Sequence, residues 1–362
     1  MVTARADGIL GAVTRILVFT ASVGEGHEVP ARALERGILE RDGSAEVHVV
    51  DALDTLGRAV RRVAEEDFRR TFGSGGGSRR FELEHRLFAR NPVGRVLGQA
   101  ALHRATRGRV ARAVADVAPD VVVSTYPALT DVLGYLRRTG RLRVPAVAAV
   151  TDLSSLWYWA SPGIDLHLLT HPESEAEVRR LAGATRIAAV RGLYDERFLE
   201  PHDPVQARAA LGVEPPVVLV SGGGWGVGDV EGAARVASEQ AATLVLAGRN
   251  ERLLGLAGVR SLPFVRDMPS VLAAADVLVH STAGLTILEA LLLGVRPISY
   301  GWSVAHVREN ERAFRRTGLA RVARDRDELR AAISSALAAP REPLAPRFAR
   351  LPHAAELVLD LT

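Results

Sequence analysis

Short apolar runs rich in β-branched residues alternate along the chain with longer segments that are apolar on a helical period. This alternation predicts β-strands followed by helices, as in parallel sheets covered by helices. The expected helices are residues 30–41, 230–239, 285–293 and 354–361. The expected strands are residues 16–20, 46–50, 121–125, 146–150, 166–170, 186–190, 217–220, 243–247, 259–262, 277–280 and 296–299.

The same pattern of strand, glycine-rich turn and helix begins twice, near residues 16 and 217. A stretch with two prolines, near residues 195–204, separates the halves. Because 362 residues exceed one ordinary core, the chain is expected to form two domains. We predict an N-terminal domain over residues 1–197, a C-terminal domain over 205–340 and a tail with a terminal helix over 341–362.

Residues 277–297 combine a strand, a turn of small residues and a helix. Such a turn directs backbone N–H groups and the positive end of the helix toward a ligand, typically a phosphate. Thr286 can add a hydroxyl, and Glu289, one turn later, can accept from the two hydroxyls of a ribose. This pattern predicts a nucleotide site. The alternative is that Thr286 and Glu289 form a capping box that only closes the helix start.

Two glycine-rich turns follow predicted strands, at residues 24–27 and 221–229. Neither completes the G-x-G-x-x-G pattern, which disfavours NAD. His27 stands at the edge of the first turn, where it either faces a ligand or caps a helix start.

Asp152 follows the predicted strand 146–150 and therefore lies where open α/β sheets bind ligands. His27 and Asp152 are the candidate bases. Trp157 follows shortly, and is either a platform for a sugar or lipid or part of a packed loop.

The composition is that of a soluble protein, with 48% apolar and 24% charged residues and no cysteine. The chain contains no apolar run long enough to span a bilayer, and residues 9–13 are too short for a signal peptide. We therefore expect a cytoplasmic protein. A net charge of +4 is too small to indicate nucleic acid.

Residues 56–117 form an arginine-rich amphipathic region interrupted by a glycine-serine stretch, 73–78, which predicts a loop. This region either contacts the inner face of a membrane or is a solvated helical segment. Asp325 and Asp327 have the spacing of a metal-binding D-x-D motif, but they precede a helix, and Asp325 is better interpreted as an N-cap. We predict no metal.

The second half resembles glycosyltransferase family 28, which includes monogalactosyldiacylglycerol synthases and the N-acetylglucosaminyltransferase of peptidoglycan assembly. The matching residues are Ser221 to Gly224, Gly248-Arg249-Asn250, Phe264, Met268, Ala275-Asp276, Ala283 to Thr286, Glu289-Ala290, Gly294 and Asn310. The first half agrees through Gly24-Glu25-Gly26-His27, Ser124-Thr125 and Thr151-Asp152. His306 stands where relatives have a glutamine.

The resemblance implies the GT-B fold, in which two facing Rossmann-like domains hold a cleft between them. It implies a UDP-sugar donor in the C-terminal domain, an acceptor in the N-terminal domain and a terminal helix that packs back. The acceptor-side residues would be Gly24, Gly26 and Trp157. The donor-side residues would be Ser221, Gly222, Gly223, Gly224, Arg249, Asn250, Phe264, Val265, Met268, Ala283, Gly284, Leu285, Thr286, Glu289, His306 and Asn310.

We therefore predict a metal-independent, inverting hexosyltransferase that moves a hexose from a UDP-sugar to a hydroxyl of a lipid or small aglycone. The nucleotide sugar is a co-substrate, and no cofactor is expected. Two alternatives remain, a non-hydrolysing UDP-sugar epimerase and a nucleotide-sugar-binding protein without catalysis.

Overall fold

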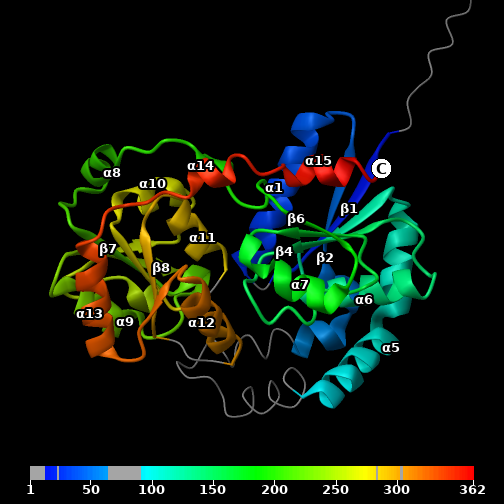
Figure 1. Ribbon diagram of the computed structural model, residues 1–362, viewed down its shortest axis with the longest axis horizontal. Helices are drawn as coiled ribbons and strands as arrows, with labels where there is room; N and C mark the ends of the chain where they lie inside the picture. Colours follow the sequence, from blue (N-terminus) through cyan, green and yellow to red (C-terminus); the bar gives the residue numbers. More distant parts are fainter. Residues whose placement is uncertain (1–12, 23, 64–90, 283, 302–304) are drawn as a thin grey trace, which may run out of the picture.

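The computed structural model describes residues 13–22, 24–63, 91–282, 284–301 and 305–362, with the backbone alone at 305 and 306. It contains two six-stranded sheets in which every pair of neighbouring strands is parallel. Helices cover both faces of each sheet, and the two α/β units lie side by side (Figure 1). The predicted fold class is confirmed.

The N-terminal sheet has the strand order β2-β1-β3-β4-β5-β6. Its strands are β1 (Arg15–Thr20), β2 (Glu46–Asp51), β3 (Val121–Ser124), β4 (Ala146–Val150), β5 (Leu166–Leu169) and β6 (Arg186–Ala189). Its helices include α1 (Glu25–Arg41), α2 (Ala52–Leu56), α5 (Pro92–Val117), α6 (Pro127–Arg138) and α7 (Glu175–Ala182), with short 3₁₀ turns η2 (Pro172–Ser174) and η3 (Glu196–Leu199).

Side chains of the interior strand β1 enter two cores, one on each face of the sheet. Leu17 and Phe19 pack with α6 residues such as Leu133, whereas Ile16 and Val18 pack with α1. A strand buried on both faces reads as a continuous apolar run, which is why the sequence pattern identified it.

The C-terminal sheet has the order β12-β11-β10-β7-β8-β9. Its strands are β7 (Val217–Ser221), β8 (Ala242–Gly248), β9 (Arg260–Pro263), β10 (Val277–His280), β11 (Arg296–Ser299) and β12 (Arg321–Val322). Its helices are α8 (Pro204–Leu211), α9 (Val230–Ser238), α10 (Met268–Ala274), α11 (Leu285–Leu292), α12 (Ala305–Thr317) and α13 (Arg326–Leu337), with 3₁₀ turns η4 (Gly223–Trp225) and η5 (Glu251–Leu253).

The tail runs back from the C-terminal unit to the N-terminal one (Figure 1). Phe348 of α14 (Ala345–Phe348) is buried in a core of the C-terminal unit. Ala354, Ala355 and Val358 of α15 (Ala354–Leu359) are buried beside α1 and β1. The last helix therefore completes the core of the first domain.

Helix α1 begins at Glu25, five residues earlier than the sequence pattern suggested. Pro30, the first residue of the expected helix, lies in the second turn of α1. Glu25 and Glu28 explain the earlier start, because acidic side chains in a first turn are stabilised by the helix dipole. Gly26 and His27 are thus helical residues rather than turn residues.

Other boundaries differ little from the expected ones. Asp203 caps α8, so the predicted linker ends in a helix. Asp325 accepts a hydrogen bond from the Glu328 N–H at 2.8 Å, which confirms its interpretation as an N-cap. The predicted loop at 73–78 lies outside the described residues.

Candidate active site

A cavity of about 890 Å³ lies between the two domains, where the carboxyl ends of both sheets meet. From the N-terminal domain it is lined by the start of α1, by Asp152 after β4 and by residues near η3. From the C-terminal domain it is lined by the ends of β7 and β8, the turn after β9 and the start of α11. The site predicted from glycine turns thus faces the opposite domain.

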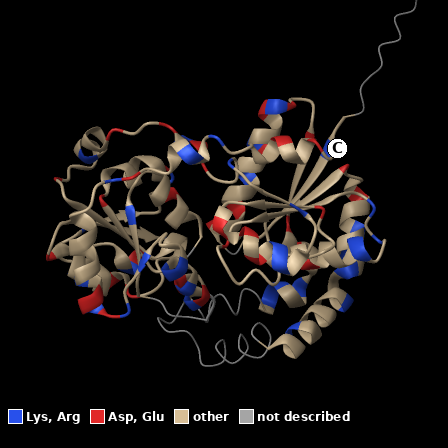
Figure 2. Ribbon diagram, in the orientation of Figure 1, with Lys and Arg blue, Asp and Glu red and all other residues tan. Residues whose placement is uncertain are grey.

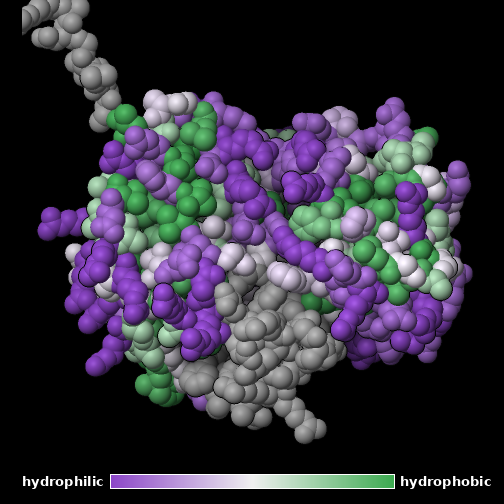
Figure 3. Space-filling model, turned by 180° about the vertical axis from the view of Figure 1, so that it is seen from behind, coloured by the Kyte–Doolittle hydropathy of each residue, from purple (hydrophilic) through white to green (hydrophobic). Residues whose placement is uncertain are grey.

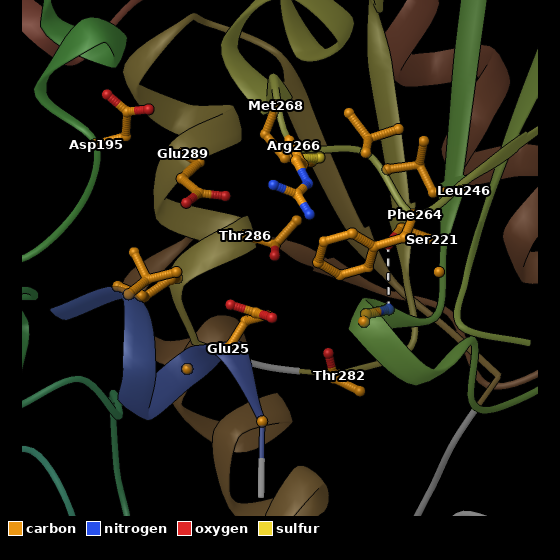
Figure 4. A pocket seen from close by; sticks show the side chains of 18 of the residues that line it. Glu25, Asp195, Ser221, Leu246, Phe264, Arg266, Met268, Thr282, Thr286 and Glu289 are labelled. Atoms are coloured by element: carbon orange, nitrogen blue, oxygen red, sulfur yellow. Dashed lines mark hydrogen bonds between the residues drawn. The ribbon is translucent and has the colours of Figure 1, made fainter. Parts of the chain in front are cut away.

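Helix α11 directs two of the predicted donor residues, Thr286 and Glu289, into this cavity (Figure 4). The N-cap residue of the helix is Gly284, and no described side chain accepts a hydrogen bond from the first N–H groups at that position. Thr286 is already the second residue of the helix, so the capping-box interpretation of Thr286 and Glu289 is wrong. Glu289 is therefore available to a ligand.

Burial dominates the environment of Glu289, which is 8% exposed. Burial, with the nearby carboxylate of Asp195, raises the pKa of Glu289 to about 8. Two hydroxyl donors at this place would stabilise the ionised carboxylate and reverse that shift.

The glycine turn after β7 is stiffened by local contacts. The Gly223 N–H donates to the Ser221 hydroxyl at 3.1 Å (Figure 4). At Gly222 a Cβ atom would collide with the backbone of Gly226 and Val227, so only glycine fits. The turn can therefore bring backbone close to a ligand.

His280, at the end of β10, joins this turn to the one before α11. Its Nδ1 lies 3.1 Å from the Ser221 carbonyl, and its Nε2 lies 2.6 Å from the Thr282 hydroxyl. Burial lowers the pKa of His280 to about 4, against the effect of the Ser221 bond. A neutral ring must donate from Nδ1 to the carbonyl, so Thr282 donates to Nε2 and its oxygen keeps free lone pairs beside the cavity.

Arg249 crosses the cavity between the two domains. Its guanidinium lies 4.5 Å from the ring centroid of Phe264 and 5.2 Å from that of Trp225. It also donates to Glu25 of α1 at 2.8 Å, and Arg32 donates to the same carboxylate at 2.7 Å. Burial raises the pKa of Glu25, but the two guanidinium groups outweigh it and hold that pKa below its usual value.

On the acceptor side, His27 is fixed by the backbone. Its Nδ1 donates to the Thr125 carbonyl at 2.8 Å, which leaves Nε2 unprotonated in the neutral ring. Burial lowers the pKa of His27, and Asp152 and the Thr125 bond oppose this. Asp152 itself accepts from the Trp159 indole at 2.8 Å. The partner that orients the imidazole is therefore Thr125.

Most of the predicted site residues come together in this one cavity. Those that line it are Gly24, Gly26, Asp152, Ser221, Gly222, Gly223, Gly224, Arg249, Phe264, Val265, Met268, Leu285, Thr286, Glu289 and Asn310. His27 is not among the lining residues, although Gly26 before it and Val29 after it in α1 line the cavity. Ala283 and the side chain of His306 lie outside the described residues.

Three more predicted residues are not among those that line the cavity: Gly284, which is the N-cap of α11, and Asn250 and Trp157. Asn250 caps η5 through Arg252 N–H and donates to the Gly226 carbonyl at 3.3 Å, so its role here is to hold the loop. Trp157 lines a different cavity, and its ring is contacted by Arg95 at 3.9 Å and by Arg180 at 4.9 Å.

Sequence reasoning missed several charged residues of the cavity, including Glu25, Arg32, Asp195, Arg197 and Arg266. Burial raises the pKa of Asp195, yet hydrogen bonds from Arg197 hold it below its usual value. Arg197 also reaches Asp267 of the other domain at 2.9 Å. Glu25 lies within the motif Gly24 to His27, but no local pattern assigned these charged residues to the cavity, because they meet only when the domains face each other.

Charged side chains of both signs are interspersed over the helices of both domains (Figure 2). When the molecule is seen from behind, hydrophilic side chains gather where the domains meet (Figure 3).

Within the described ranges, no three His, Cys, Asp or Glu residues form a group that could hold a metal ion. No helix in the described part of the chain has both the length and the apolar character needed to cross a membrane.

Two family models match the chain. Residues 27–188 match the monogalactosyldiacylglycerol (MGDG) synthase family, and residues 230–339 match glycosyl transferases group 1. The first match lies within the N-terminal domain and the second within the C-terminal domain, and residues of both matched ranges line the cavity.

Curated relatives and solved structures are similar to the chain as well. A processive diacylglycerol beta-glucosyltransferase of Bacillus subtilis is 24% identical over 90% of this chain and 87% of its own length. A probable chloroplastic monogalactosyldiacylglycerol synthase of Nicotiana tabacum is 29% identical over 51% of this chain and 39% of its own length. Spinosyn rhamnosyltransferase SpnG has a TM-score of 0.62 at 14% identity, covering 96% of this chain and all of that one. MurG of Acinetobacter baumannii has a TM-score of 0.55 at 14% identity, covering 96% of this chain and 99% of its own.

Proposed function

We propose that this chain, which has the GT-B fold and resembles glycolipid-forming glycosyltransferases, transfers a hexose from a UDP-sugar to the free hydroxyl of a diacylglycerol. The observation that supports this most is one cavity that joins the start of α11 with Asp152, whose negative charge acts on the buried His27 of α1. The names of two relatives, a diacylglycerol glucosyltransferase and a monogalactosyldiacylglycerol synthase, and the match to the MGDG synthase family support diacylglycerol as the acceptor.

In this proposal Glu289 binds the ribose hydroxyls and Thr286 binds a phosphate at the N-terminus of α11. The uracil lies against Phe264 and Val265, and Arg249 pairs with the diphosphate. Backbone N–H groups of the turn 222–224 and the dipole of α11 stabilise the charge that develops on the leaving diphosphate. No metal is required by these interactions.

On the acceptor side, the hydroxyl loses its proton to the His27–Asp152 pair as its oxygen attacks the anomeric carbon. The new C–O bond forms while the bond to the diphosphate breaks, so UDP leaves and the configuration inverts. The negative charge of Asp152 favours the imidazolium that results. The acceptor is a lipid, so we propose that the enzyme works as a peripheral protein at a membrane surface.

The test is to incubate the protein with diacylglycerol in vesicles and with UDP-glucose, UDP-galactose or TDP-sugars in turn. Mass spectrometry should find a hexosyl-diacylglycerol with a UDP-sugar, and NMR should find a β-linkage from an α-linked donor. The TDP arm is included because SpnG, a structural neighbour with a TM-score of 0.60, was solved with thymidine diphosphate. Conversion of UDP-sugar without any acceptor would instead support an epimerase.

A further inference from the structure

Thr282 lines the cavity between the domains but has no role yet in the proposed function. It lies between β10 and α11 and is partly exposed. Glu289, Thr286 and Thr282 follow one another along the wall of the cavity (Figure 4). In the proposed function, Glu289 binds the ribose and Thr286 binds a phosphate. Because the sugar of a nucleotide sugar follows the phosphates, Thr282 lies on the side where the transferred hexose would be.

The hydrogen bonds of His280 decide what the Thr282 hydroxyl can offer to a ligand. The Ser221 carbonyl, 3.1 Å from Nδ1 of His280, can only accept, so Nδ1 carries the proton. Burial lowers the pKa of His280 to about 4, so the ring is neutral at neutral pH and its Nε2 is an acceptor. The Thr282 oxygen lies 2.6 Å from Nε2 and donates its only proton to it. Thr282 can therefore only accept a hydrogen bond from a ligand.

A hydroxyl that can only accept selects the chemistry of its partner. The oxygens of the diphosphate in a nucleotide sugar carry no proton at neutral pH, so they cannot donate to Thr282. The hydroxyl groups of a hexose can donate. Thr282 is therefore complementary to the sugar of the donor and not to its phosphates.

A second acceptor lies at the same end of the cavity, on the other domain. A Cβ atom added at Gly223 would lie 3.5 Å from the Thr282 hydroxyl oxygen, and one added at Gly224 would lie 3.6 Å from Cγ of Glu25. Burial raises the pKa of Glu25, but hydrogen bonds from two arginines outweigh it, so the carboxyl is ionised and can only accept. Thr282 and Glu25 thus surround this end of the cavity with acceptors, which suits a polyol (Figure 4).

We propose that Thr282 determines donor specificity by accepting a hydrogen bond from one hydroxyl of the transferred hexose. The inference rests on the proposed function, because it names the part of the UDP-sugar that this residue contacts. A donor without that hydroxyl leaves the Thr282 oxygen unpaired, so the cavity binds it more weakly. The enzyme would then discriminate against sugars that are deoxygenated at that one position.

The experiment measures binding by isothermal titration calorimetry without an acceptor, so that no transfer product forms. The ligands are UDP, UDP-glucose, UDP-galactose and the analogues in which fluorine replaces one sugar hydroxyl at a time, because fluorine cannot donate a hydrogen bond. Thr282→Val removes the hydroxyl, and Thr282→Ser keeps it. Thr286→Val is the matched control, because it removes a hydroxyl that is proposed to bind a phosphate.

Thr282→Val should weaken binding of the preferred UDP-hexose by about three- to tenfold and leave the affinity for UDP within about twofold of the wild type. Thr286→Val should weaken both ligands alike, and Thr282→Ser should behave like the wild type. One fluoro analogue should bind the wild type about three- to tenfold more weakly than its parent, and this difference should vanish in Thr282→Val. Equal losses for UDP and UDP-hexose in Thr282→Val, or analogue losses that all persist in it, overturn the inference.

Failure of the proposed function would give a different result. If the expected binding pattern is found but the wild type forms no hexosyl-diacylglycerol, the transfer to diacylglycerol is contradicted and the role of Thr282 stands. If transfer occurs but Thr282→Val binds every ligand as the wild type does, only the role of Thr282 is contradicted. A wild type that binds neither UDP nor a UDP-hexose contradicts both.

Discussion

At the scale of single residues, Glu289 combines burial with a proposed role, ribose binding, for which it must be charged. The carboxyl is protonated in much of the unliganded protein at neutral pH, because burial raises its pKa to about 8. Ribose hydroxyls would stabilise the ionised form, so nucleotide binding should release a proton. Glu289 is thus suited to bind a ligand, but its burial lowers the stability of the unliganded protein at neutral pH.

Glu289→Gln should separate these two effects. We expect it to weaken UDP binding by about tenfold or more, as for the loss of a charged hydrogen-bond acceptor. In the wild type, stability should be fully present below pH 4.5, the ordinary pKa, and fall as pH rises toward about 8. The glutamine variant should therefore have the higher Tm at pH 8 and an equal Tm at pH 4. Calorimetry with and without UDP measures both the UDP affinity and the Tm of each protein. Unchanged UDP affinity in Glu289→Gln would contradict the ribose role.

His27 and Asp152 can be distinguished by the pH dependence of kcat/KM. His27→Ala should lower kcat by about 100-fold or more with donor affinity nearly unchanged, as for the loss of a general base. Asp152 raises the pKa of His27, so Asp152→Asn should move the acid limb of the profile to lower pH while slowing turnover. A His27→Ala enzyme with near-normal turnover would leave Asp152 as the base.

The sequence pattern predicted which side chains lie together when those side chains belong to one helix or one strand. Thr286 and Glu289 share a face because they are three residues apart on one helix, and helical spacing predicts that directly. Glu25 could not be assigned in this way, since its partner Arg249 follows a strand of the other domain. Trp157 was placed on the correct loop, but the pattern could not determine which cavity it faces.

At the scale of elements, the strands were predicted because buried parallel strands are continuous apolar runs. The start of α1 was missed because a proline is common in the first turn of a helix, whereas Pro30 lies in the second turn. Strand β12, with two residues, is too short for any periodicity. The sequence also gave no indication that η4 would form within the glycine turn.

The contact of α15 with α1 leads to a prediction about Gly37. A Cβ atom at Gly37 would overlap the ring of His353, which is 2% exposed and whose Nδ1 accepts from the Ala355 N–H at 3.0 Å. Gly37→Ala should therefore destabilise the protein by about 1 to 3 kcal/mol, as overpacking usually does.

The matched control is Gly108→Ala in α5, where no atom lies within 4 Å of the added Cβ. There we expect a gain of about 0.5 to 1 kcal/mol, because alanine is the better helix former. Urea unfolding measures both variants. A neutral Gly37→Ala would mean that α15 moves away from α1 at little cost.

At the scale of the whole molecule, the GT-B fold and the resemblance to glycolipid-forming glycosyltransferases are confirmed. The domain pattern was visible because each half repeats strand, glycine turn and helix. The depth of the cavity and its charged lining were not visible in the sequence, because they depend on how the two sheets face each other. Both come from residues more than 100 positions apart, such as Glu25 and Arg249.

Catalysis should proceed without a divalent ion. The proposed leaving-group stabilisation uses the dipole of α11, the turn 222–224 and Arg249, and none of these requires a metal. Hexose transfer should therefore survive excess EDTA, measured as product per minute by mass spectrometry. Loss of activity that Mg²⁺ or Mn²⁺ restores would overturn this account.

Glu25 forms an ion pair with Arg249, the residue that we propose to bind the diphosphate of the donor. Donor binding would therefore replace one anionic partner of Arg249 by another. Arg249 would leave one anion, the carboxylate of α1, for another, the diphosphate, so the number of close charge pairs at this guanidinium hardly changes. Added salt weakens the old pair and the new one alike. The affinity of the wild type for UDP should therefore vary little with ionic strength. In Glu25→Gln, Arg249 has no carboxylate to leave when the diphosphate binds. This variant should bind UDP more tightly than the wild type at low salt and lose that advantage as salt rises. Glu40→Gln, exposed on the same helix, should behave like the wild type. A steep salt dependence in the wild type would mean that Glu25 and the diphosphate do not share Arg249.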